Sequence, residues 1–286
     1  MIGDNIISSL AYADDLVLFG KTELDLQDSI NDLDRACLEY GMKISSSKTK
    51  VMHVGKCQKR INCSLSGSII EQVSEFNYLG CIFSEDGKLD KEFEQRRVNG
   101  SKVVSQLRSH IYNKKELSEE TKLLIHKSIF RPTILYGSES WVDSGCLIND
   151  LEVADMNVLR LISGVSRRDQ WEQGIHNEDI RTVFEIESVE EMARRSRLRW
   201  YGHVERMNEV RLPKKILYSE ANGVRKRGRP RRRFMDSVKS DLQERCLDLN
   251  SNIIGLARDR RAWRGVVYGV EAVGPDAERH TRVVNV

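Results

Sequence analysis

The sequence predicts an α+β fold, with short strands in the first third of the chain and helices in the rest. Up to about residue 83, short runs rich in β-branched and aromatic residues alternate with turn residues. From Leu89 onward, apolar residues recur at helical spacing instead. The chain has 286 residues, of which 40% are hydrophobic and 31% charged. That length supports a sizeable core in one large domain or two small ones.

The composition excludes several classes of protein. No apolar run approaches the ~18 residues that a membrane span needs, and no signal-peptide pattern stands at the N-terminus. The six cysteines are scattered without any CxxC pair: Cys37, Cys57, Cys63, Cys81, Cys146 and Cys246. This spacing argues against a disulfide framework and against a regular zinc site. We therefore expect reduced thiols, no membrane partner and an intracellular location.

Two adjacent carboxylates, Asp14 and Asp15, stand between two short apolar runs near the start of the chain. Residues 6–10 and 16–19 are predicted strands, because β-branched and aromatic side chains favour strands. The few residues between them favour a hairpin with both acids at or beside its tip. Neighbouring carboxylates repel each other, and a hard cation such as Mg²⁺ would offset this repulsion. The alternative is a solvated turn, since Asp is a favoured turn residue.

A helix is predicted to follow this hairpin. Thr22 with Asp25 three residues later resembles a capping box in which Asp replaces the preferred Glu. Gly41 stands where a left-handed C-cap is expected. The apolar residues between them share one helical face, which we expect to pack on the hairpin: Leu26, Ile30, Leu33 and Cys37.

Three stretches after this helix are predicted to contain strands and turns. Residues 41–52 are expected to form strand, turn and strand, with Lys48 in or near the turn, and residues 61–70 carry turn residues at their centre. Residues 76–83 are predicted as one strand closed by a turn at 84–87. Gly80 in that strand permits another chain to approach the backbone closely. The alternatives are an ordinary surface lysine and an ordinary sheet strand.

The helical part begins at Leu89. The first helix is expected to bury Val103, Val104, Leu107 and Ile111 on one face. A second helix is predicted from Ser118, with Arg131-Pro132 ending or kinking it. Its expected apolar face consists of Leu124, Ile125, Ser128 and Ile129.

Two later helices are predicted in the same way. One covers residues 151–163 and places most of its apolar residues on one side: Leu151, Met156, Leu159 and Ile162. A closing helix is predicted over residues 236–249. The tail after Gly269 is expected to be poorly ordered.

The charge of the chain is unevenly distributed. Residues 194–234 contain 15 Lys or Arg against three Glu, a net charge of +12. The remaining 31 basic and 40 acidic residues give −9, and the two together make the +3 of the whole chain. A basic block inside an otherwise acidic chain predicts a polyanionic partner, most simply a nucleic acid.

Two stretches of this block combine arginines with features that suit nucleic acids. The first mixes arginines with an aromatic side chain that could stack on bases: Arg194, Arg195, Arg197, Arg199 and Trp200. The second is extended by Gly and Pro: Arg225, Lys226, Arg227, Arg229, Arg231, Arg232 and Arg233. For the second, a nuclear-localisation sequence or a solvated basic loop is the alternative, and the former suggests the nucleus.

The run Tyr12-Ala13-Asp14-Asp15, flanked by Leu16-Val17-Leu18-Phe19, resembles the metal-binding hairpin of reverse transcriptases, particularly those of non-LTR (LINE-type) retrotransposons. The resemblance implies an RNA-directed DNA polymerase that uses two Mg²⁺ ions with an RNA template and a DNA primer. Asp14 and Asp15 would be its catalytic metal ligands. Lys48 would lie near the phosphates of the incoming nucleotide and could neutralise or protonate the pyrophosphate.

The resemblance continues along the chain in the expected order. Tyr78, Leu79 and Gly80 resemble the primer-grip hairpin, which implies contact with the primer strand. It implies a partial palm over 1–87, helices of a thumb over 88–143, and a helical, basic, nucleic-acid-binding region over 144–286. An Arg-Trp-Gly-His-like segment and a Gly-Arg-Pro segment recur in the C-terminal region of such polyproteins, although Tyr201 is inserted in the first of them here.

The catalytic set of this family includes a third carboxylate, from an earlier strand of the palm. Only residues 2–8 precede the hairpin strongly enough to be compared, and they supply neither that carboxylate nor the fingers. We therefore expect a fragment that binds Mg²⁺ weakly and is inactive by itself. A palm without its early strands exposes an unpaired edge, which predicts self-association.

A binding protein without catalysis is the competing interpretation. The Arg-Gly-Arg-Pro run at residues 227–230 resembles an AT-hook, an extended arm that enters the narrow minor groove of A·T-rich duplex DNA. A transposon relic without any selected role is a third possibility.

Overall fold

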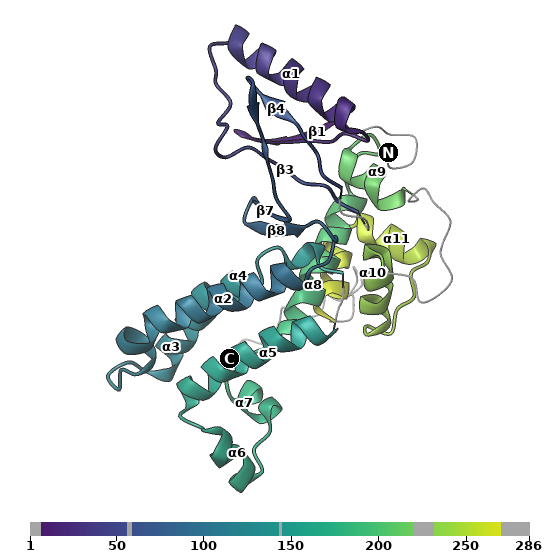
Figure 1. Cartoon of the computed structure of the whole chain (residues 1–286). Coiled ribbons are helices and arrows are strands. Elements are labelled where there is room, and N and C mark those ends of the chain that lie inside the picture. Colours follow the sequence, from purple (N-terminus) through teal and green to yellow (C-terminus); the bar gives the residue numbers. More distant parts are fainter. Residues whose placement is uncertain (1–6, 56–58, 143–144, 220–231, 270–286) are drawn as a thin grey trace. The chain divides into compact units, whose positions relative to one another are not determined.

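The computed structural model describes residues 7–55, 59–142, 145–219 and 232–269 (Figure 1). The chain forms two compact units, of which the first ends at Gln95 and the second begins at Arg96. Helix α2 (Asp90–Leu107) runs across this boundary. The thumb-like segment and the C-terminal region that were predicted as separate domains both lie in the second unit.

The first unit combines one helix with short strands, as an α+β fold requires. Strands β1 (Ser9–Tyr12) and β2 (Asp15–Leu18) form the predicted hairpin. The remaining strands pair as β3 (Lys50–Val51) with β6 (Glu71–Gln72), β4 (Ser64–Leu65) with β5 (Ser68–Ile69), and β7 (Glu75–Tyr78) with β8 (Cys81–Ser84). Only the pair β3–β6 is parallel. Among the described residues these are four two-stranded sheets and not one continuous antiparallel sheet.

Helix α1 (Glu23–Glu39) has the predicted ends. The Thr22 hydroxyl accepts a hydrogen bond from the Asp25 N–H (3.1 Å), and the Asp25 carboxylate accepts one from the Thr22 N–H (3.1 Å), which completes the capping box. Gly41 follows the C-cap Tyr40 with a φ of +68°, as a left-handed C-cap requires.

Helix α1 also completes the short strands beside it. The side-chain amide of Gln27 pairs with the backbone of Ser64 as a neighbouring strand would, donating to its carbonyl (2.9 Å) and accepting from its N–H (2.7 Å). Below this contact a small core is buried: Ile30, Val51, Cys63, Leu65 and Ile70. Leu18 of β2 and Leu26 of α1 pack against it, so the base of the hairpin is anchored on the helix.

The second unit consists of helices in its described residues. After α2 these are the π-helical turn η1 (Arg108–Tyr112), α3 (Glu119–Ile125), the π-helical turn η2 (His126–Phe130), α4 (Arg131–Ile134), the 3-10 turn η3 (Ser138–Ser140), α5 (Gly145–Ser163), α6 (Arg167–Gln173), α7 (Asn177–Val183), α8 (Val189–Glu205), α9 (Leu212–Tyr218), α10 (Phe234–Gln243), α11 (Ser251–Arg258) and α12 (Arg260–Tyr268).

The helix predicted from Ser118 exists, but its predicted face was wrong. The Ser118 hydroxyl caps α3 by accepting from the Thr121 N–H (3.2 Å). Leu124 and Ile129, however, are 66% and 45% exposed. The buried face contains Lys122, His126 and Phe130 instead. Spacing of apolar residues could not find it, because two of these three side chains are polar and η2 departs from α-helical periodicity.

The helix predicted over 151–163 is the later part of α5, and its predicted face is buried: Leu151, Met156, Leu159 and Ile162. Helix α8 supplies Leu198 and Tyr201 to a second core, into which α10, α11 and α12 contribute Leu242, Ala257 and Trp263. The predicted closing helix ends earlier than expected, at Gln243, and two further helices follow it.

The expected tail after Gly269 lies outside the described residues. Within those residues no helix is long and apolar enough to cross a membrane. The four cysteines that the structure describes, Cys37, Cys63, Cys81 and Cys246, are free thiols.

Candidate metal-binding hairpin and nucleic-acid interface

The turn of the first hairpin consists of Ala13 and Asp14. Tyr12 pairs with Asp15 as the last pair of the β1–β2 ladder, so Asp14 is in the turn and Asp15 begins β2. Ala13 has a φ of +52°, a left-handed conformation that costs free energy in a residue with a Cβ. A two-residue hairpin turn needs such a conformation, and here an alanine supplies it.

Both carboxylates of this turn face solvent. Asp14 and Asp15 are exposed, and within the described residues neither accepts a hydrogen bond or forms an ion pair. The base of the hairpin is closed by a hydrogen bond from the Phe19 N–H to the Ser8 carbonyl (2.8 Å). The hairpin therefore presents two adjacent carboxylates, without a protein cation to neutralise them, on a strand pair anchored below.

Asp14 and Asp15 fit the oxygen chemistry of Mg²⁺, which binds to one or two carboxylates and retains waters or substrate phosphates as its other ligands. In the residues that the structure describes, no group of three or more acidic, histidine or cysteine side chains could hold a metal. These two residues therefore offer an incomplete ligand set.

Lys48 lies in a turn, as predicted. The Thr49 N–H and hydroxyl both donate to the Ser45 carbonyl, at 3.0 and 2.8 Å, and these bonds close the turn before β3. The side chain of Lys48 is exposed and has no ion-pair partner among the described residues. The residues before this turn are not a strand, contrary to the prediction for 41–52.

The primer-grip-like residues form a hairpin, but its turn is not where it was predicted. Residues 76–83 are not one strand, because Leu79 and Gly80 form a two-residue turn between β7 and β8. Both have positive φ, +50° and +78°, as the type I′ turn of a hairpin requires. Leucine is uncommon in that conformation, so the sequence gave no turn signal there. Tyr78 packs edge-on against Phe83, with ring centroids 6.4 Å apart.

Arg197 was predicted to bind phosphates, and the structure assigns it a structural position instead. Its side chain is 2% exposed, and its Nε and Nη2 donate to both carboxylate oxygens of Asp241, at 2.7 and 2.8 Å. This pair joins α8 to α10. Arg197 is therefore removed from the predicted phosphate-binding set.

The neighbouring arginines are also engaged within the fold. Arg194 donates to Glu191 (2.6 Å) and is 15% exposed. Arg195 donates to Glu191 (3.0 Å), pairs with Glu187, and lies over the ring of Tyr268, 4.7 Å from its centroid. These contacts hold α8 to the C-terminal helices and leave little of either guanidinium for a ligand.

Arg199 and Trp200 remain accessible. Arg199 is exposed, with a single long hydrogen bond of 3.4 Å to the Arg195 carbonyl, and Trp200 is 36% exposed. Residues 225–231, with Arg225, Lys226, Arg227, Arg229 and Arg231, lie outside the described residues. Arg232 and Arg233, just before α10, are exposed.

This division predicts opposite behaviour for two neighbouring arginines. Arg197→Gln is expected to lower the free energy of unfolding by about 3–5 kcal/mol, because Asp241 would stay buried without its counter-charge. Arg199→Gln is expected to leave stability within ~0.5 kcal/mol and to weaken nucleic-acid binding. Urea denaturation and fluorescence anisotropy with a labelled oligonucleotide measure the two effects. A stable Arg197→Gln variant with selectively reduced binding would return Arg197 to the interface.

Comparison with known families agrees with the geometry of the hairpin. Residues 4–83 match the family model described as "Reverse transcriptase (RNA-dependent DNA polymerase)". The matched range includes Asp14, Asp15, Lys48 and the primer-grip-like turn. This segment of the chain is therefore of the reverse transcriptase type, which confirms the resemblance read from the Tyr-Ala-Asp-Asp run.

The chain is also similar to a curated relative over almost its whole length. It is 26% identical over 275 residues to a Caenorhabditis elegans protein described as a putative uncharacterized transposon-derived protein. The similar region covers 91% of this chain and 95% of the relative, so it extends through the helical second unit. No solved structure matches the chain.

Proposed function

We propose that the chain is a fragment of the RNA-directed DNA polymerase of a non-LTR retrotransposon. The observation that carries this proposal is the exposed pair Asp14 and Asp15 on a two-residue hairpin within the segment that matches reverse transcriptases. The similarity to a transposon-derived protein along both units supports a mobile-element origin. RNA template and DNA primer are the partners that this proposal implies.

The chemistry follows from the groups available. In the intact polymerase the 3′-hydroxyl oxygen of the primer attacks the α-phosphorus of the nucleotide; the bond from this phosphorus to the bridging oxygen breaks, pyrophosphate leaves, and the hydroxyl proton is lost. Asp14 and Asp15 would hold Mg²⁺, which stabilises the attacking and leaving oxygens when bound. Lys48 would place a cation near the pyrophosphate. Leu79 and Gly80 would present their turn to the primer strand.

The 286 residues alone are expected to be inactive. Asp14 and Asp15 are two ligands, and the described residues offer no third acidic side chain beside them. Binding of the purified chain to a primed RNA template should be measured with and without Mg²⁺ and nucleotides, scoring extension in the same tube. The expected result is salt-dependent binding without extension.

The Asp14→Ala variant is the control for this experiment. Extension that is abolished in Asp14→Ala would contradict the proposed inactivity and would show that the catalytic set is completed in another way. Absence of both binding and extension would remove the nucleic-acid function itself.

The second candidate function is nucleic-acid binding without any polymerase ancestry in its role, through the basic segment 194–234. Its support is narrower than the sequence suggested, because Arg194, Arg195 and Arg197 are engaged within the fold. What favours it is the exposed pair of Arg199 and Trp200, together with the AT-hook-like run. Binding to A·T-rich duplex in preference to primed template would select this candidate. A nuclear location belongs to the same proposal.

A further inference from the structure

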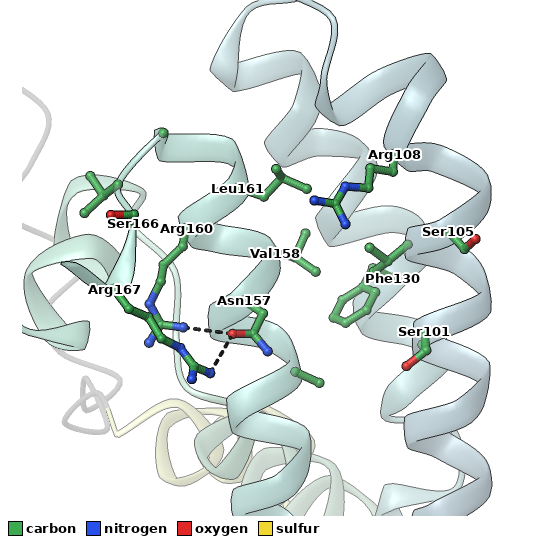
Figure 2. A pocket seen from close by; sticks show the side chains of 15 residues that line it. Ser101, Ser105, Arg108, Phe130, Asn157, Val158, Arg160, Leu161, Ser166 and Arg167 are labelled. Carbon is green, nitrogen blue, oxygen red and sulfur yellow. Dashed lines mark hydrogen bonds between the residues drawn. The ribbon is translucent and has the colours of Figure 1, made fainter. Parts of the chain in front are cut away.

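A groove of about 700 Å³ lies in the second unit, between α2 and α5 (Figure 2). One wall is α2, with Ser101, Ser105 and Arg108. The other wall is α5 and the start of α6, with Arg160 and Arg167. None of these residues belongs to the basic segment 194–234 or to the two hairpins. Sequence patterns did not point to this groove, because its arginines are separated by up to 59 positions along the chain.

The charge of the groove is entirely positive. Its lining residues include three arginines, Arg108, Arg160 and Arg167, and no carboxylate. Within the described residues none of the three forms an ion pair, although most arginines of α8 do. The lining also contains hydroxyl groups, from Ser101, Ser105 and Ser166 among others. Three cations with hydrogen-bond donors and without a counter-charge are the chemistry of an anion site.

Two of these cations are held together by a neutral group. The side-chain oxygen of Asn157 accepts hydrogen bonds from Arg160 Nη1 (3.0 Å) and from Arg167 Nη2 (3.2 Å), as the dashed lines in Figure 2 show. Burial and the nearby charge of Arg167 both lower the pKa of Arg160. The fold therefore places two like charges side by side, and a bound anion would relieve their repulsion.

The remaining lining is apolar. Val104 of α2 faces Val158 and Leu161 of α5 across the groove, with Phe130 of η2 at its inner end. One helical turn after Arg167, on the same face of α6, Trp171 is 83% exposed. Apolar walls beside cations suit the faces of bases, and an exposed tryptophan near them suits stacking.

We propose that this groove binds the backbone of a single-stranded nucleic acid, with phosphates at Arg108 and at the Arg160–Arg167 pair and bases on the apolar walls. A single strand is favoured over a duplex because a duplex covers the base faces that the apolar walls would contact. The inference rests on the proposed function in that a polymerase fragment must hold a template strand. It adds a second contact region that is independent of residues 194–234.

The structural role of the arginines sets which variants are informative. Arg160 braces α5 against its neighbours, donating to Gln170 (2.6 Å) and Asn177 (3.0 Å), so its replacement would disturb the fold. Arg108 and Arg167 are exposed and make no such braces. Arg168 is the matched control: it is adjacent to Arg167, is 83% exposed, does not line the groove, and pairs with Glu172 (2.7 Å).

The test compares the full chain with the double variant Arg108→Gln/Arg167→Gln and with Arg168→Gln. Binding to a labelled single-stranded oligonucleotide is measured by anisotropy over a range of salt concentrations. The double variant is expected to lower the slope of log K against log salt by about 1.4, since each lost phosphate contact on a single strand removes ~0.7. If the affinities converge at 1 M salt, this is a roughly 25-fold loss at 0.1 M. Arg168→Gln is expected to keep both the slope and the affinity.

Each outcome decides the proposal. A double variant with the slope and affinity of the parent chain overturns the groove proposal and leaves the proposed function intact. Equal loss in Arg168→Gln also overturns it, since that result indicates a general charge effect. A parent chain that binds no nucleic acid overturns both. Competition by inorganic phosphate at millimolar concentration, with no added affinity for an oligonucleotide, would reduce the groove to a simple anion site and overturn the nucleic-acid assignment.

Discussion

Replacement of Gly202 by alanine is expected to destabilise the second unit by about 3 kcal/mol or more. A Cβ at this position of α8 would lie 2.2 Å from Nε1 and 2.3 Å from Cδ1 of Trp263, distances that no real contact allows. Trp263 is 2% exposed, and its Nε1 donates to the Leu198 carbonyl (2.8 Å). The indole would have to move, which would break a buried hydrogen bond and open the core. Urea denaturation of the purified variant measures the loss.

Gly255→Ala is the control for this prediction. Gly255 lies inside α11, which packs on the same core, and no atom lies within 4 Å of where its Cβ would be. Alanine has the better helix propensity, so this variant is expected to be neutral or to gain up to ~1 kcal/mol. If both variants unfold at the urea concentration of the parent chain, the close packing of α8 on Trp263 is wrong.

Asp155→Asn is expected to cost about 3–5 kcal/mol of folding free energy. Asp155 is fully buried and accepts hydrogen bonds from Arg131 Nε (3.0 Å) and Nη2 (2.6 Å), while His126 Nε2 lies 3.0 Å from the same carboxylate. Arg131 is itself 3% exposed. Neutralising the acid would leave a buried guanidinium without a counter-charge. Glu172→Gln, which breaks the exposed pair with Arg168, is expected to change stability by less than ~0.5 kcal/mol.

The same cluster predicts a pH dependence. Burial by itself would raise the pKa of Asp155, but the hydrogen bonds from His126 and Arg131 outweigh burial and hold it below its ordinary value. A depressed pKa contributes stability that is fully present above the unfolded value, near 3.9, and is lost as the pH falls through the folded value. Urea denaturation between pH 6 and 3 should therefore show a steeper loss for the parent chain than for Asp155→Asn. Parallel curves would contradict this assignment.

The local features of the fold could be predicted from the sequence because they depend on neighbouring residues. The capping box of Thr22 and Asp25 and the left-handed Gly41 are each set within one turn of chain. The buried face of α5 follows from apolar spacing alone. The acidic hairpin was found in the same way, since a two-residue turn with two carboxylates is fully written in a few consecutive positions.

The features that were missed depend on residues distant in sequence or on unusual backbone. Arg197 was assigned to phosphates because its partner Asp241 lies 44 positions away and only the fold brings them together. The turn at Leu79 was hidden because leucine rarely occurs at positive φ. The face of α3 and η2 was wrong because its buried residues include Lys122 and His126, which apolar spacing cannot identify.

The turn of the first hairpin makes its loop length a stricter requirement than its composition. All of β1 and half of β2 are exposed, so burial does little to fix how these strands pair, and the two residues between them set the alignment. Inserting or deleting one residue between Tyr12 and Asp15 would move every following side chain of β2 to the opposite face. Asp15 would then point away from Asp14, and Leu18 would leave the core under α1. Copies of this sequence with a single-codon insertion or deletion there would lose the paired carboxylates and the anchor of the hairpin together, whereas many point substitutions would spare both.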